Sequence, residues 1–393
     1  MKAEKAVLTD KRFYAQPQKE ENKDLRSKTQ AEVPAIMEQI LKLCETPSPT
    51  GCVHQAQALV VAKLKEMGLE PFLSHKGTVF CELKKLGAPS DWGTEPKALL
   101  LSAHIDTLGL IVRSIKGNGR LMLTLDGGYP FQYVEQENAT LFTREGRTYE
   151  GTIRLTNPAV HASREVGTME RNDKTMEMVL DEPVKNREDV EKLGIRQGDF
   201  IFLETRSRLS GSGFLKSRHL DDKASAGMLL HLAQEVAQGK VELKRKTYLA
   251  FTTYEEVGHG ASAGHPTDIV DMLAVDMGVV GDDLDTDEYC LSICAKDSSG
   301  PYDYDFTTAL IHLAEEKELK FAVDIYPFYG SDASAALHAG HDYRTALVGT
   351  GVAASHGYER IHEEGVANTY SLLKSLVGLT FEDFELLWQK QAQ

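Results

Sequence analysis

The residues best suited to chemistry in this chain are histidines and carboxylates that follow short apolar runs. They form five short blocks: AHID at 103–106, LDDK at 220–223, EEVG at 255–258, VDMG at 275–278 and SHG at 355–357. Imidazole and carboxylate groups without a thiolate suit zinc, cobalt or manganese rather than an iron–sulfur cluster. The blocks therefore predict a metal site with nitrogen and oxygen ligands.

The elements around these blocks would bring the candidate ligands together. Apolar runs predict strands that end before His104, before Glu255–Glu256 and at Asp276. The pair Asp221–Asp222 opens a predicted helix, and His356 follows a further predicted strand. In an open parallel sheet, ligands gather in the crevice beyond the carboxyl ends of the strands. We therefore expect these residues near one edge of one sheet.

The number of candidate ligands favours two metal ions. Two histidines and at least three carboxylates exceed the three protein ligands of a usual catalytic zinc ion. Such a surplus indicates two ions that share a bridging carboxylate. Two divalent cations carry a charge of about +4, which three carboxylates would largely offset. The predicted cofactor is a pair of divalent metal ions, with zinc expected and cobalt or manganese also accepted by such ligands.

Several blocks also have a simpler interpretation. Asp106 could merely solvate a strand end, whereas in the functional interpretation it accepts a hydrogen bond from the far ring nitrogen of His104 and fixes its tautomer. Asp221–Asp222 could be no more than a helix N-cap. Glu255 and Glu256 are harder to explain without a function, because adjacent acids at a strand end repel each other unless a cation or solvent relieves them.

The remaining candidates differ in how strongly they indicate a site. Asp276 closes a strand with a buried pattern, and an unpaired buried carboxylate is costly. His356 by itself would be an ordinary polar residue of a glycine-rich loop. His219, His259 and His362 lie near the blocks and are interpreted as unrelated to the site.

Composition limits the class of protein. The chain has 393 residues, of which 41% are hydrophobic and 26% charged, and this indicates a globular protein of about two domains with a large core. Its net charge of −15 argues against nucleic-acid and membrane partners, because phosphate binding needs a basic surface. Five cysteines, and an N-terminus without the apolar segment of a secretory signal, favour free thiols in the cytoplasm.

Helical and strand-like patterns alternate over most of the chain and predict an α/β fold. We expect a mainly parallel or mixed sheet covered by helices. Residues 1–30 are polar and predict a loosely attached extension, whereas 31–125 and 213–393 would form the catalytic domain. Between these parts, residues 126–212 have short β-like runs and glycine-rich turns, which predict an inserted β-rich domain.

Taken in order, the five blocks resemble those of the M42 family of metallo-aminopeptidases, cytosolic enzymes of the dinuclear zinc peptidase clan. The resemblance runs from about residue 34 to 378, and Gly330-Ser331-Asp332-Ala333 is similar to a Gly-Thr-Asp-Ala turn of that family. The implied activity is removal of the N-terminal residue from short peptides. The implied assembly is a homo-oligomer, commonly a hollow dodecamer, which the inserted domain would hold together.

The resemblance also implies how the metal ligands are shared. Asp221 would bridge the two ions. One ion would also contact His104 and Asp276. The other would contact Glu256 and His356.

The same resemblance implies a catalytic role for Glu255 as the general base, which takes a proton from water and returns it to the leaving amine. Asp106, two residues after His104, is the second predicted catalytic residue and would support that histidine. Three positions depart from the family pattern. Thr107 occupies the position of an acid in the family, Lys223 that of an arginine, and Gly357–Tyr358 that of a Ser-Pro pair. None of them removes an implied ligand, so they bear on substrate preference rather than on dinuclear hydrolysis.

Other functions fit some of the same residues. The first alternative is a dinuclear carboxypeptidase or amide deacylase of the same clan, acting for example on a small acylated dipeptide, and Lys223 favours it. A glycoside hydrolase would use a carboxylate pair such as Glu255 and an aspartate, and would need no metal. A non-catalytic binding or assembly protein would be expected to lack a key ligand, yet all five implied ligands and the base are present.

Overall fold

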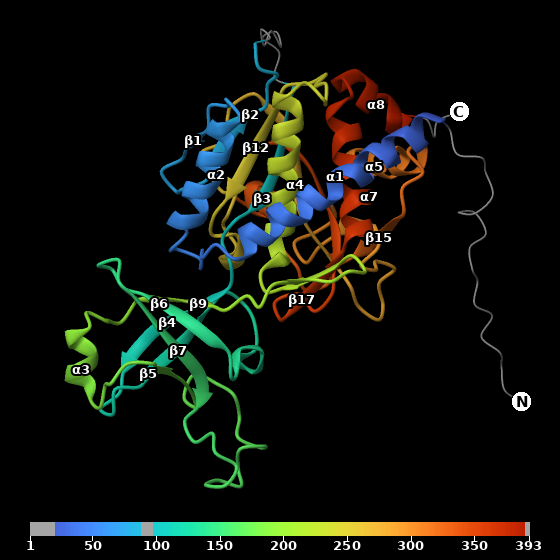
Figure 1. Cartoon of the computed structure of the whole chain (residues 1–393). Helices are drawn as coiled ribbons and strands as arrows, with labels where there is room; N and C mark the ends of the chain where they lie inside the picture. Colours follow the sequence, from blue (N-terminus) through green and yellow to red (C-terminus); the bar gives the residue numbers. More distant parts are fainter. Residues whose placement is uncertain (1–19, 88–96, 390–393) are drawn as a thin grey trace, which may run out of the picture.

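The chain forms an α/β part and a β-barrel (Figure 1). The computed structural model describes residues 20–87 and 97–389. The expected α/β fold with a separate β-rich part is confirmed. All five cysteines lie in the described residues and none forms a disulfide. Among the described helices, none combines the length and the apolar composition that a membrane crossing requires.

Eight strands form the central sheet, in the order β1-β2-β12-β3-β13-β16-β14-β15. Their bounds are β1 (Phe72–Leu73), β2 (Val79–Glu82), β3 (Ala98–His104), β12 (Thr247–Thr252), β13 (Ile269–Val279), β14 (Leu291–Lys296), β15 (Phe321–Ile325) and β16 (Arg344–Val352). The four middle strands, β12, β3, β13 and β16, run parallel, whereas β2 and β14 are antiparallel to their inner neighbours. The carboxyl ends of the parallel strands therefore meet at one crevice.

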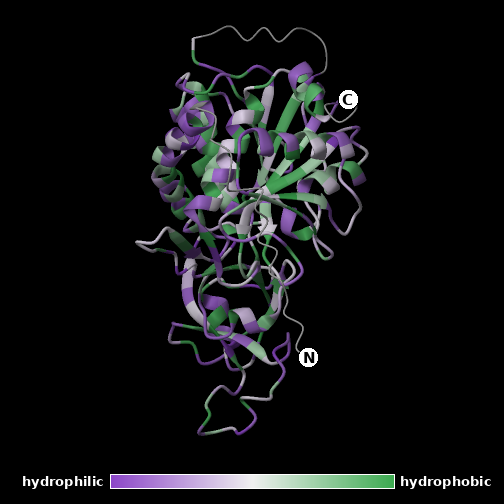
Figure 2. Cartoon of the chain, turned by 90° about the vertical axis from the view of Figure 1, so that its right-hand side faces the viewer, coloured by the Kyte–Doolittle hydropathy of each residue, from purple (hydrophilic) through white to green (hydrophobic). Residues whose placement is uncertain are grey.

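Helices cover both faces of this sheet. They are α1 (Glu20–Cys44), α2 (His54–Glu66), α4 (Leu220–Ala237), α5 (Tyr304–Glu316), α6 (Asp332–His338), α7 (Glu363–Val377) and α8 (Phe381–Gln389). On β3, Leu99 and Leu101 face a core shared with most of the helices, whereas Leu100 faces the opposite side, where α6 packs. All seven residues of β3 are buried, as expected for a strand covered on both faces. Figure 2 shows hydrophobic residues gathered along the sheet.

Helix α1 begins earlier than the sequence indicates. It starts at Glu20, so the prediction of a loosely attached extension over 1–30 is wrong for its last part, and residues 1–19 lie outside the described residues. Asn22 is buried, and its Nδ2 donates to the carbonyl of Glu316 at 2.8 Å. A helix turn held by polar contacts lacks the apolar stripe by which a helix is recognised in a sequence.

The barrel consists of six antiparallel strands that close in the order β4-β5-β8-β7-β6-β9. Their bounds are β4 (Gly109–Ile115), β5 (Leu121–Asp126), β6 (Asn138–Phe142), β7 (Thr148–Leu155), β8 (Met176–Leu180) and β9 (Phe200–Leu203). One short α-helix, α3 (Arg187–Lys192), belongs to this part. The barrel begins with β4, so the predicted boundary at 126 lies too late. The apolar pattern of β4 and β5 identifies them as strands, but it does not show which sheet they join.

A small antiparallel sheet joins the segment that returns from the barrel to a strand near the C-terminal end of the α/β part. Its strands are β10 (Arg208–Leu209), β11 (Phe214–Ser217) and β17 (Glu359–His362). β11 leads into α4, and β17 follows the loop after β16 and leads into α7. This sheet therefore sets the position of the start of α4 relative to that loop.

Candidate metal centre

The carboxyl ends of the parallel strands carry four of the predicted residues. His104 is the last residue of β3, and Glu255 and Glu256 follow β12 in a short 3₁₀ helix, η3 (Glu255–Val257). Asp276 lies within β13, beyond the last residue of that strand that pairs with β3. β13 continues past it, so the prediction that Asp276 closes its strand is wrong. Because β3 no longer runs alongside, Asp276 still lies at the crevice.

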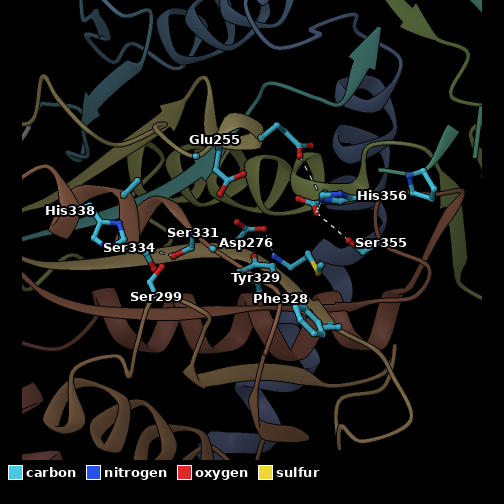
Figure 3. Close-up of a pocket in the computed structure, with 18 of the residues that line it drawn as sticks. Glu255, Asp276, Ser299, Phe328, Tyr329, Ser331, Ser334, His338, Ser355 and His356 are labelled. Carbon is cyan, nitrogen blue, oxygen red and sulfur yellow. Dashed lines mark hydrogen bonds and ion pairs between the residues drawn. The ribbon is translucent and has the colours of Figure 1, made fainter. Parts of the chain in front are cut away.

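The crevice opens into a cleft of about 550 Å³ (Figure 3). In Figure 3, Ser334 and His338 line one side of the cleft and His356 the opposite side, with Glu255 and Asp276 between them. A cleft of this volume takes a small molecule or the end of a peptide.

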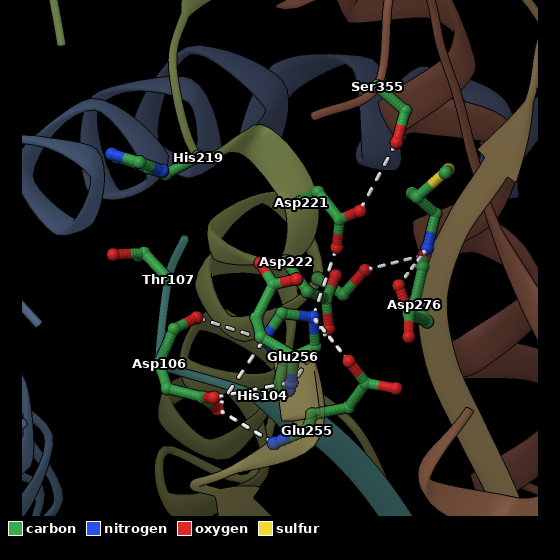
Figure 4. A network of polar contacts seen from close by, with 12 residues as sticks. His104, Asp106, Thr107, His219, Asp221, Asp222, Glu255, Glu256, Asp276 and Ser355 are labelled. Atoms are coloured by element: carbon green, nitrogen blue, oxygen red, sulfur yellow. Dashed lines mark hydrogen bonds and ion pairs between the residues drawn. The ribbon is translucent and has the colours of Figure 1, made fainter. Parts of the chain in front are cut away.

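Asp221 lies between the two predicted histidines. It stands in the first turn of α4, where the backbone is not helical and its peptide bond to Asp222 is cis. Its Oδ1 is 3.0 Å from Nε2 of His104 (Figure 4), and its Oδ2 is 3.4 Å from Nε2 of His356. Each carboxylate oxygen thus faces a different imidazole.

The site divides into two halves around Asp221. The His104 half consists of His104, Asp276 and Oδ1 of Asp221, and ligand atoms of these three residues lie within 4.8 Å of one another. The His356 half consists of His356, Glu256 and Oδ2 of Asp221. In this half, Nε2 of His356 is 3.6 Å from Oε2 of Glu256. The structure therefore brings all five predicted ligand residues together.

Each histidine is oriented through its other ring nitrogen. Nδ1 of His104 is 3.0 Å from the main-chain oxygen of Asp106, and Nδ1 of His356 is 2.7 Å from that of Gly128. A carbonyl oxygen can only accept, so Nδ1–H donates and Nε2 is the ring atom that could hold a metal ion. Gly128 follows β5, so a segment next to the barrel orients one of the two rings.

The carboxylate of Asp106 does not bond the ring of His104 as predicted. Its Oδ1 is 3.7 Å from Nδ1 of that ring and instead accepts from the main-chain N–H of Glu255 at 3.3 Å. Oδ2 accepts from the main-chain N–H of Glu256 at 3.3 Å and from the Thr50 hydroxyl at 2.7 Å. The side chain of Asp106 therefore positions the two glutamates, while its carbonyl orients the imidazole.

The site concentrates buried negative charge. Burial raises the pKa of Glu256 to about 8 and that of Asp276 to about 7, and the charge of Asp221 adds to both shifts. Burial opposes protonation of His356, but its hydrogen bond with Asp221 and the charge of Glu256 outweigh burial and raise its pKa to about 10. Oε1 of Glu256 and Oδ1 of Asp222 are buried without a hydrogen-bond partner. Such a donor set fits divalent cations, which would relieve the repulsion.

Two of the positions that depart from the family pattern, Thr107 and Lys223, are buried. Nζ of Lys223 donates to Oγ of Ser48 and to the carbonyl of Ile105, both at 2.6 Å, so it does not reach the cleft. Thr107 donates to the neighbouring carbonyl of Leu108. Both residues therefore act inside the fold.

The three histidines interpreted as unrelated to the site have other contacts. His219 is buried and its ring packs against Phe202, and His259 stacks on Tyr254. His362 caps the N-terminus of α7.

Four non-glycine residues beside the site have left-handed backbone conformations. The φ values are 67° for His219, 67° for Tyr254, 58° for Ala354 and 65° for His356. Each conformation of this kind costs about 1–3 kcal/mol for a residue with a side chain. The surrounding contacts must therefore hold these loops in place.

Two contributors to the site were not predicted. Glu359, the first residue of β17, accepts from the main-chain N–H of Asp221 at 3.1 Å and of His356 at 2.8 Å. The other is the carbonyl of Gly128. An acid three residues after a candidate histidine is a weak signal in a sequence, and a main-chain carbonyl leaves no signal at all.

An α/β sheet that presents imidazoles and carboxylates to an open cleft is the architecture of a metal-dependent hydrolase. A family model described as M42 glutamyl aminopeptidase matches residues 90–372. The chain belongs to this family of metal-dependent aminopeptidases and is a peptide hydrolase.

Individual relatives agree with this assignment. The chain is 43% identical over 337 residues to a Bacillus subtilis (strain 168) protein named as the aminopeptidase YhfE. The alignment covers 86% of this chain and 95% of the relative. A TET aminopeptidase from the marine sediment archaeon Thaumarchaeota archaeon SCGC AB-539-E09 has the same fold, with a TM-score of 0.79, 20% identity and coverage of 90% and 99%. The Pyrococcus horikoshii TET1 peptidase does too, with a TM-score of 0.75, 22% identity and coverage of 87% and 99%.

Proposed function

We propose that the protein is a dinuclear metal-dependent aminopeptidase that removes the N-terminal residue of short peptides. The main support is the position of Asp221, whose two oxygens face the imidazoles of His104 and His356. One carboxylate between two ligand groups suits a pair of cations that share it. The family description supports the peptide class of substrate.

Each half of the site would hold one divalent ion. Asp221 would contribute to both, with His104 and Asp276 in one half and Glu256 and His356 in the other. The ligand set suits zinc, and cobalt and manganese are also compatible with it. When bound, such ions polarise a peptide carbonyl and lower the pKa of water.

Glu255 is assigned as the general base. Its Oε2 is 3.7 Å from Nε2 of His104, and the residue lines the cleft, so it reaches the region where a substrate would meet the metal centre. It would take a proton from the attacking water and transfer it to the leaving amine. Burial raises the pKa of Glu255 well above its usual range, which helps it hold the proton between these steps. Asp106 positions this base through the main-chain N–H of Glu255.

We further propose that the chain forms a homo-oligomer in the cytoplasm. The Pyrococcus horikoshii TET1 peptidase can assemble into a tetrahedron or a large octahedral shell. The barrel, whose first strand begins at Gly109, is the part proposed to mediate contacts between copies. A closed shell would admit short peptides only. Five unpaired cysteines fit a reducing cytoplasm.

The alternative of a carboxypeptidase or amide deacylase loses its main argument. Lys223 would have to face the cleft to bind a terminal carboxylate, but its ammonium group is buried against Ser48 and Ile105. Identifying the residue released from a tripeptide separates these activities. Release of the C-terminal residue would contradict the proposal.

The experiment that tests the mechanism is Glu255→Gln. We expect turnover of aminoacyl amides to fall roughly 10²–10⁴-fold, because the base is lost, while the chain keeps about two metal ions. Asp324→Asn is the control, since the carboxylate of Asp324 is buried and lies outside the cleft. Near-normal turnover in Glu255→Gln would show that the base is assigned wrongly.

A further inference from the structure

Glu359 joins the two segments that carry Asp221 and His356. Glu359 begins β17, and its partner on the antiparallel strand β11 is Ser217. β11 leads to Asp221 at the start of α4, and the loop before β17 carries His356. The small sheet therefore brings both segments to the side chain of Glu359.

The carboxylate of Glu359 accepts one main-chain N–H from each segment. Oε2 accepts from Asp221 at 3.1 Å, and Oε1 accepts from His356 at 2.8 Å. The residue is 2% exposed and lies at a small cavity together with Asp221 and His356, rather than in the lining of the cleft. Glu359 thus does not face a substrate, and both of its oxygens are occupied by the protein backbone.

The local backbone explains why this contact matters. Ala354 and His356 both have positive φ values, without the conformational freedom of glycine. Main-chain hydrogen bonds between Ala353 and Arg360, of 2.9 and 3.1 Å, close the loop at its base. Within the loop, the contact with Glu359 holds the main-chain N–H of His356.

We propose that Glu359 is a positioning residue that fixes Asp221 and His356 relative to each other and so sets the metal affinity of the His356 half. This inference rests on the proposed dinuclear function. The His104 half shares only Asp221 with this contact, whereas the His356 half has both Asp221 and its histidine held by it. Loss of Glu359 therefore weakens metal binding in the His356 half more than in the His104 half.

The test uses the full chain, stripped of metal and titrated with Co²⁺. Bound cobalt per chain, its visible absorption and thermal unfolding are measured. Glu359→Gln keeps the size of the side chain but replaces one acceptor oxygen by a donor, which opposes a main-chain N–H. We expect the second equivalent of Co²⁺ to bind about tenfold more weakly or worse, with the first little changed and turnover largely restored at saturating cobalt.

Glu359→Asp separates the position of the carboxyl group from its chemistry. The aspartate keeps this group but withdraws it by one methylene, so it cannot reach both N–H groups. We expect the second cobalt equivalent to be weakened here too. Wild-type cobalt affinity in this variant would overturn the positioning role, and the variant carries the test if Glu359→Gln does not fold.

Asp324→Asn is the matched control. The carboxylate of Asp324 is also buried and accepts from two main-chain N–H groups, those of Asp285 and Thr286, each at 2.9 Å, but it lies outside the cleft. We expect a lower Tm with both cobalt equivalents unchanged. The same pattern in the Glu359 variants would overturn the proposal. A wild-type chain that binds fewer than two ions would instead contradict the dinuclear function, so the two failures are distinguishable.

Discussion

The two halves of the metal centre differ in what holds them. In the His104 half, the side chains come from β3 and β13 at the middle of the sheet, and the His104 side chain is 2% exposed. In the His356 half, the histidine lies in a loop with a left-handed backbone, and its side chain is 34% exposed. Its ring is oriented by Gly128 beside the barrel and its backbone by Glu359.

The His104 half is therefore held in place by the sheet, whereas the geometry of the His356 half depends on contacts made by its loop. Strands buried on both faces hold the His104 half through the sheet itself, whereas the His356 half relies on contacts between three separate segments. We therefore expect the ion of the His104 half to dissociate more slowly. The following experiments test that comparison.

Asp221→Ala would break both halves at once, since Asp221 faces both imidazoles. We expect the loss of nearly all bound metal and of activity by about three orders of magnitude or more, because the contribution of both cations is removed. Metal analysis after dialysis and turnover measure the effect. Two tightly bound ions in this variant would refute the bridging position, and Asp324→Asn serves as the control.

His104→Ala and His356→Ala would separate the halves. In wild type we expect chelator to remove the two ions in two phases that differ roughly tenfold or more in rate, since the surroundings of ligands tune affinity by such factors. His356→Ala should lack the fast phase, and His104→Ala the slow one. The reverse assignment would mean that the exposed loop holds its ion more firmly than the sheet does.

The smallest expected effect concerns pH and Asp126, which precedes the Gly127–Gly128 segment of the His356 half. Burial, followed by the charge of Asp106, raises the pKa of Asp126 to about 7, and its Oδ2 has no hydrogen-bond partner. The folded state thus holds a proton that the unfolded chain releases near pH 4, so the stability that the neutral Asp126 carboxyl contributes is lost as pH rises from about 4 to 7.

Asp126→Asn removes this dependence. We expect the Tm of the variant relative to wild type to rise between about pH 4 and pH 7 and to level off above, as measured by thermal unfolding in matched buffers. A difference in Tm that does not change with pH would show that Asp126 is not protonated in the fold. The His104 half should be unaffected throughout.

The candidate site was largely predictable, because its side chains come from blocks that end apolar strands. His104 and Glu255–Glu256 could be recognised in this way. The contact of Asp106 could not, since the sequence does not tell whether its carboxylate or its carbonyl meets the imidazole. The contribution of Glu359 could not be predicted either, because it depends on the pairing of β11 with β17, which joins residues about 140 positions apart.

The fold shows the same limit. The parallel centre of the sheet followed from the alternation of helices and strands, but the start of the barrel did not, because β4 has the apolar pattern of any buried strand. Helix α1 was missed at Glu20 for the opposite reason, since polar residues such as Asn22 are buried there. Both errors concern which surface a segment meets, and single-segment patterns do not contain that information.

The left-handed loops beside the metal centre also bear on efforts to make this enzyme heat-resistant. Glycine adopts the left-handed conformation without strain, so glycine at Tyr254 or Ala354 would relieve roughly 1 kcal/mol each. Yet these residues adjoin Glu255 and His356, and glycine would give their loops new conformations to explore. Stability gained at these positions would come with a looser catalytic geometry, so the exposed faces of the helices are the safer place for such substitutions.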